Sequence, residues 1–175
     1  PVPRRVLSCL ACPLPRAATP LHSARPGAGI ANPLLAMARL IASLLDSDGR
    51  VAVAAFYDQV TDLTTVERAA IAALPSDEAA YLAMVGAPSG VGEPGYTILE
   101  RQWTRPTLEI NGMWGGYEGP GQKTVIPREA HAKITCRLVP PQSPPDLIAT
   151  LLRHLELPFH NRQPLHSDQR AHQPP

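Results

Sequence analysis

The sequence predicts an α+β domain in which an antiparallel sheet of about four strands has helices packed on one face. Amphipathic helical patterns lie near both ends of the central region, between residues 32 and 155. A strand with strict apolar–polar alternation lies at residues 130–139. The order helix, short helices, strand, strand, helix is typical of a sheet covered on one side. A chain of 175 residues is long enough for one domain with a hydrophobic core.

The first predicted helix begins after Asn32. Asparagine is a good N-cap and Pro33 suits the first helical position. Apolar residues then recur at helical spacing: Leu34, Met37, Leu40, Ile41, Leu44 and Leu45. Gly49 can adopt a left-handed conformation, so we expect the helix to stop before it.

Two short helices are expected next. Thr64 and Glu67 have the spacing of a capping box, which opens a helix that runs to about Ala73. A second helix begins around residues 76–78 and runs to about Val85. Residues 86–95 are rich in glycine and proline and indicate a loop.

Two strands and a helix complete the domain. Residues 107–113 alternate apolar and polar side chains. In the strand at 130–139, one face carries Ala132, Ile134, Cys136 and Leu138, and the other carries His131, Lys133, Thr135 and Arg137. The last helix follows Ser143 and has an apolar face formed by Leu147, Ile148, Leu151, Leu152 and Leu155.

Residues 112–121 contain five glycines. Such a segment is either a loop shaped around a ligand or a long hairpin turn, and spacing does not separate the two.

The proline-rich and polar ends suggest poor order. We expect a poorly ordered segment at 1–20, in which only Val6 to Leu10 has a weak strand pattern. Residues 158–175 lack the large apolar side chains that offset ordering entropy, so we expect a disordered tail. The folded domain is therefore predicted at 21–157. The chain begins with proline rather than methionine, so we expect a fragment or a processed piece.

Composition limits the partners and the compartment. A net charge of +1 argues against nucleic-acid binding, and no apolar run is long enough to span a membrane. Three cysteines do not support a disulfide framework, which favours a cytoplasmic location. Cys9 and Cys12 have C-x-x-C spacing but lack the sequence context of a redox or zinc site.

The polar face of the predicted strand is the main candidate for chemistry. The Arg137 guanidinium can bind a carboxylate through two parallel hydrogen bonds, although a solvated sheet face has the same pattern. No metalloprotease helix motif, phosphate-binding loop or nucleophile elbow occurs.

Several runs resemble the dimerisation ("lid") domain of carnosinase-like dipeptidases. They are GMWGGY at 112–117, GPGQKTVIP at 119–127 and HAKITCRLVP at 131–140, and the spacing from Leu21-His22-Ser23 to Ala31-Asn32-Pro33 also matches. The similarity covers roughly residues 21–157. These dipeptidases belong to the zinc metallopeptidase family that also holds aminoacylase.

The resemblance implies a ferredoxin-like lid that works beside a separate catalytic domain with two zinc (or manganese) ions. In that family the lid dimerises and lends a histidine to the partner's active site, where it stabilises the oxyanion. His22 matches this position. Thr124 and Arg137 match the residues that hold the small peptide substrate, with the arginine on its terminal carboxylate. The family usually has D-L-H-S-G, whereas Pro20 and Ala24 flank this motif here.

We therefore expect the dimerisation and substrate-capping domain of a zinc-dependent dipeptidase. The chain alone is predicted to be inactive, because no zinc ligand set can be assembled from its residues. The alternatives are a non-catalytic homodimerisation module and a truncated gene product without activity of its own.

Overall fold

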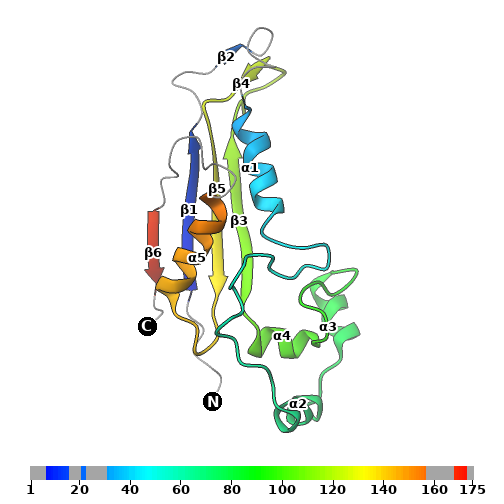
Figure 1. The fold of residues 1–175 in the computed structure, drawn as a ribbon. Coiled ribbons are helices and arrows are strands. Elements are labelled where there is room, and N and C mark those ends of the chain that lie inside the picture. The colour runs from blue at the N-terminus through cyan, green and yellow to red at the C-terminus, as the bar shows by residue number, and fades with distance from the viewer. Residues whose placement is uncertain (1–6, 16–20, 23–30, 157–167, 173–175) are drawn as a thin grey trace.

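The computed structural model describes residues 7–15, 21–22, 31–156 and 168–172 (Figure 1). Its main sheet has four antiparallel strands in the order β3-β5-β1-β6, and a two-stranded sheet pairs β2 with β4. The strands are β1 (Leu7–Pro15), β2 (Leu21–His22), β3 (Thr107–Gly115), β4 (Val125–Ile126), β5 (Glu129–Arg137) and β6 (Asp168–His172). The helices are α1 (Pro33–Ala42), α2 (Thr65–Ala72), α3 (Glu78–Val85), α4 (Ile98–Thr104) and α5 (Pro144–Glu156).

Helices α1 and α5 lie against the same face of the main sheet, whereas α2, α3 and α4 gather near one end of it (Figure 1). The predicted fold class, an antiparallel sheet of about four strands with helices on one face, is confirmed.

Strand β5 shows why the helices occupy one face. Its even-numbered residues from Ala130 to Cys136 are buried, and its odd-numbered residues are exposed or partly exposed. The buried side chains join residues of α1 and α5 in one core. That core contains Met37, Leu40, Leu44, Val51, Val53, Phe56, Leu108, Ala130, Ala132, Ile134, Cys136, Leu138, Leu147, Leu151 and Leu155.

Helix α1 begins as predicted but ends earlier. The Asn32 side chain accepts a hydrogen bond from the amide of Leu34 at 2.9 Å, and Pro33 occupies the first turn. The helix ends at Ala42. In the turn that follows, the Asp46 carboxylate accepts a hydrogen bond from the amide of Arg50 at 2.9 Å. Leu44 is still buried in the core.

Capping boxes start two of the short helices. The predicted box of Thr64 and Glu67 opens α2. Thr97 and Glu100 form the same arrangement at α4, a helix that was not predicted from the sequence. The sequence contains the capping residues of α4. The helix has only seven residues and follows a glycine-rich loop, so its pattern is weak.

Strands also occur within the two expected end segments. Strand β1 occupies Leu7–Pro15, inside the segment 1–20, and pairs with β5 along its whole length. The backbone N–H and C=O groups of β5 need hydrogen-bond partners, and β1 supplies them on one side. The apolar–polar pattern of a strand does not indicate which segment pairs with it. Pro13 lies beyond Leu7–Ala11, the part of β1 that pairs with β6, so it interrupts no described pairing on that side.

Strand β6 likewise lies within 158–175, the expected disordered tail. The remaining residues of both end segments lie outside the described part of the chain. The expected domain at 21–157 thus shares its main sheet with strands on either side of that range.

The glycine-rich segment connects β3 to β4 and folds onto one of its own side chains. A Cβ on Gly119 would lie 2.5 Å from the hydroxyl oxygen of Tyr117, and that hydroxyl donates a hydrogen bond to the carbonyl of Pro120 at 3.0 Å. Glycine is required at 119 because the Tyr117 side chain occupies the space of a side chain there.

Truncation in the core should be costly. Leu151→Ala on α5 is expected to lower the free energy of unfolding by about 3 kcal/mol, because it leaves a cavity beneath the helix. Urea denaturation followed by circular dichroism measures the change. Arg153→Ala, on the exposed side of the same helix, should change stability by less than about 0.5 kcal/mol. Equal effects of the two substitutions would contradict the assigned helix face.

Candidate functional site

The segments of two predicted site residues meet at one end of the molecule. His22 pairs with Val125 across the β2–β4 sheet, and Thr124 immediately precedes β4. The backbone of His22 therefore lies beside the Thr124 segment, at the top of Figure 1. The His22 side chain lies outside the described part of the structure. We call this end of the molecule, formed by β2 and residues 123–126, the tip.

Arg137 lies at the opposite end. It is the last residue of β5 and stands in register with Thr107 of β3. The eight residue steps from Glu129 to Arg137 span about 27 Å at the rise of a β-strand. The structure therefore does not bring Arg137 together with His22 and Thr124 within one copy of the chain. We call the end of the sheet at Thr107 and Arg137 the base.

The Arg137 side chain is exposed on the face of β5 away from α1 and α5. Within the described residues, its guanidinium takes part in no hydrogen bond or ion pair. Its donors are therefore available to a ligand.

His131, the other residue singled out on this face, has partners. Its ring stacks on Trp114 with 5.0 Å between centroids and 6° between planes, and its Nε2 lies 3.7 Å from Oε1 of Glu129. The Lys133 Nζ lies 5.4 Å from the centroid of Trp114. A register shift between Ile110 and Gly112 places Trp114 opposite His131. Sequence alternation alone did not reveal this irregularity.

A cavity of about 640 Å³ lies at the base. Arg137, Thr107 and Glu109 line it from the sheet. The other lining residues come mainly from α3, α4, the loop at 89–93 and the segment at 45–57. Sequence patterns do not reveal this cavity, because its lining residues are far apart in the chain.

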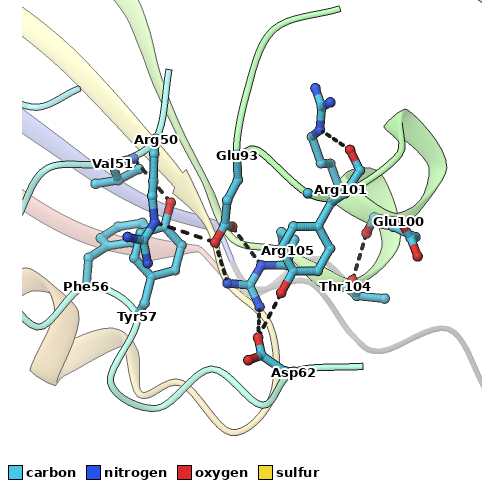
Figure 2. A network of polar contacts seen from close by, with 12 residues as sticks. Arg50, Val51, Phe56, Tyr57, Asp62, Glu93, Glu100, Arg101, Thr104 and Arg105 are labelled. Carbon is cyan, nitrogen blue, oxygen red and sulfur yellow. Dashed lines mark hydrogen bonds and ion pairs between the residues drawn. The ribbon is translucent and has the colours of Figure 1, made fainter. Parts of the chain in front are cut away.

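Arg105 also lines the cavity, and its guanidinium is the centre of a network of ion pairs (Figure 2). Its Nε and Nη2 donate to the two carboxylate oxygens of Glu93, each at 2.7 Å, and its Nη1 donates to Asp62 at 2.9 Å. The side chains of Arg105 and Glu93 are only 5% and 10% exposed. Because both charges are nearly removed from water, each depends on the other.

Aromatic rings complete the surroundings of Arg105. Its guanidinium carbon lies 4.5 Å from the ring centroid of Tyr96 and 5.5 Å from that of Tyr57. Burial by itself would lower the pKa of Arg105, but the hydrogen bonds and charge of Glu93 raise that pKa above its ordinary value. Burial also raises the pKa of Tyr57 and of Tyr96. The hydroxyl of Tyr96 donates to Asp62 at 2.8 Å and lowers the pKa of that carboxyl.

The guanidinium of Arg101 also donates hydrogen bonds within the protein. Its Nε donates to the carbonyl of Tyr96 and its Nη1 to the carbonyl of Val91, both at 2.8 Å. Of the three arginines that line the cavity, Arg101 and Arg105 hold the walls in place, and Arg137 is the one whose guanidinium has no partner among the described residues.

The described residues contain no group of three or more His, Cys, Asp or Glu side chains that could hold a metal ion. They therefore do not fit a zinc or manganese centre. Nor does any helix among them have the length and apolar character needed to cross a membrane.

Comparison with known proteins identifies the domain. Residues 18–162 match the model of the peptidase dimerisation domain, and the chain belongs to this family. It is 33% identical to human Beta-Ala-His dipeptidase over 141 residues, which cover 81% of this chain and 28% of the relative. It is 28% identical over 139 residues to the Cys-Gly metallodipeptidase DUG1 of Saccharomyces cerevisiae, covering 79% of this chain and 29% of the relative.

Solved structures show the same fold. The crystal structure of human carnosine dipeptidase 1 superposes with a TM-score of 0.81 at 28% identity, over 95% of this chain and 36% of that one. The M20 family metallo-carboxypeptidase Sso-CP2 from Sulfolobus solfataricus gives a TM-score of 0.79 at 31% identity, over 95% and 43%. The predicted family is confirmed. The chain spans less than a third of the length of these curated relatives.

The Arg105 network should be essential for stability. Arg105→Met is expected to lower the free energy of unfolding by about 3 kcal/mol, because it leaves the Glu93 carboxylate buried without its main partner. Thermal and urea unfolding measure the loss. Adding Glu93→Gln should recover part of it, since the unpaired charge is then removed.

Arg128→Met is the matched control, because the ion pair of Arg128 with Glu129 is exposed. We expect it to cost less than about 0.5 kcal/mol. An Arg105→Met variant as stable as this control would contradict the role assigned to the network.

Proposed function

We propose that this chain is the dimerisation and substrate-capping domain of a metallodipeptidase, and that a substrate is held by two copies of it. The observation that carries the proposal is the placement of Arg137 and the tip at opposite ends of β5. An extended dipeptide is only about 7 Å long, so it cannot reach both ends of a strand that spans about 27 Å.

The exposed edge of the main sheet supports self-association. Among the described strands, β3 pairs on one side only, with β5. Met113 and Trp114 are exposed on this edge strand, and Leu34 and Leu35 are exposed on the neighbouring α1. An unpaired strand with apolar neighbours is suited to pairing with a second copy about a two-fold axis.

Antiparallel pairing of two β3 strands would also bring Arg137 of one copy close to the tip of the other. It would place the base of one copy beside the tip of the other, because paired antiparallel strands run in opposite directions. Each of two equivalent sites would then take Arg137 from one copy and His22 and Thr124 from the other.

The side chains at such a site have distinct roles in the proposal. The Arg137 guanidinium binds the terminal carboxylate of the peptide through two hydrogen bonds. Thr124 of the other copy holds the substrate, and His22 donates to the oxyanion that develops at the scissile carbonyl. The metal ions of a dipeptidase would be held by a separate catalytic domain, since the described residues supply no ligand set for them. We propose a cytoplasmic location, in keeping with the odd number of cysteines.

A homodimerisation module without a role in catalysis is the second candidate. The same exposed edge of β3 favours it. The two candidates differ at Arg137, since an association module gives this guanidinium no carboxylate to bind.

Disrupting the proposed dimer edge should separate the copies. Met113→Lys is expected to weaken self-association at least about tenfold, because a lysine on an edge strand opposes pairing with another strand. Analytical ultracentrifugation over a concentration series measures the dissociation constant.

Val66→Lys is the control, because Val66 is an exposed apolar residue on α2, away from the β3 edge. Its dimer affinity should match that of the unaltered chain. A chain that is monomeric at all concentrations, or dimers that tolerate Met113→Lys, would refute dimerisation through β3.

A further inference from the structure

The cavity at the base is lined by apolar side chains as well as by Arg137. Leu82 and Val85 of α3 and Ile98 of α4 contribute to this wall. Arg137 and Thr107 lie on the sheet side of the same cavity. A carboxylate bound to Arg137 would therefore lie in a cavity that also offers an apolar surface.

Helix α3 is unusual because it is largely apolar yet has no buried residue. Its sequence, EAAYLAMV, carries its charge at the first position only. Apolar surface inside a concave site gains free energy when a ligand covers it. The part of α3 that lines the cavity is therefore suited to contact an apolar group.

The cavity is held in shape by the residues beneath it. A Cβ on Gly92 would lie 3.2 Å from Cδ of Arg101, and a Cβ on Gly49 would lie 2.9 Å from Cγ1 of Val91. Both glycines have positive φ. Arg101 also donates a hydrogen bond to the carbonyl of Val91. Together these contacts hold the loop at 89–93 in place. A preformed wall spares a ligand part of the cost of ordering it.

Charge in the cavity restricts the ligand further. Glu93 and Glu109 also line it. Glu93 is neutralised by Arg105, but Glu109 has no hydrogen bond or ion pair among the described residues. A second negative charge on a ligand would be repelled by Glu109, whereas an apolar group would not.

We propose that this cavity receives the side chain of the C-terminal residue of a substrate peptide and selects an apolar side chain over glycine or an acidic one. The inference rests on the proposed role of Arg137, which anchors the neighbouring carboxylate. It assigns α3 and the 89–93 loop a part in specificity.

Titration of the ¹⁵N-labelled chain with the dipeptides Gly-Leu, Gly-Gly and Gly-Glu tests the proposal by NMR. We expect Gly-Leu to bind about tenfold more tightly than Gly-Gly, and Gly-Glu to bind no better than Gly-Gly. Val85→Ser should reduce the preference for Gly-Leu to about twofold, because it removes apolar contact from the wall.

Met84→Ser is the matched control. Met84 is the preceding residue of the same helix and is exposed, but it does not line the cavity. Its preference for Gly-Leu should be unchanged. A preference that survives in Val85→Ser, or that is lost equally in Met84→Ser, overturns the proposed subsite.

Arg137→Ala separates this inference from the proposed function. It should weaken Gly-Leu and Gly-Gly by similar factors of about ten or more. If it weakens neither, the carboxylate clamp is refuted, even if the apolar preference persists. If it weakens both but no variant of the wall alters the preference, the clamp stands and the subsite is refuted. Absence of any binding at about 10 mM peptide overturns both.

Discussion

The pairing of β5 with β1 along its whole length, and with β3 from Ala130 to Arg137, is the constraint on which the rest of the structure depends. It holds nine residues fully extended, so that alternate side chains are committed either to the helix-covered core or to the opposite face. The same extension fixes Arg137 at the base and the tip at the other end. A shorter or broken β5 would lose both the core and the separation between the two groups of candidate site residues.

A second constraint acts at the base. The short helices α2, α3 and α4 bury few residues, so they gain little from the main core. The ion network of Arg105, Glu93 and Asp62 links three segments of this region, and the rings of Tyr57 and Tyr96 lie against the guanidinium of Arg105. Directional bonds thus take the place of a large apolar core. They also place the apolar wall of α3 and the loop opposite the end of β5.

Local patterns in the sequence revealed the elements that depend on local interactions. The cap at Asn32, the capping box at Thr64 and the alternation of β5 all predicted what the structure contains. Strand β1 could not be predicted with the same ease, because its proline-rich sequence gains its order from pairing with β5. The family motifs identified His22, Thr124 and Arg137 as candidates. Their distribution over two ends of the sheet needed the register of distant strands, as did the cavity at the base.

The central claim is that the base of one copy lies beside the tip of another. Electron-spin distance measurement between a nitroxide at Glu109 in one copy and a nitroxide at Lys123 in the other tests it most directly. The account predicts that this distance between copies is shorter than the distance between the same two positions within one copy, measured after dilution with unlabelled chain. A distance between copies that equals or exceeds the distance within one copy would contradict the antiparallel arrangement and the shared site.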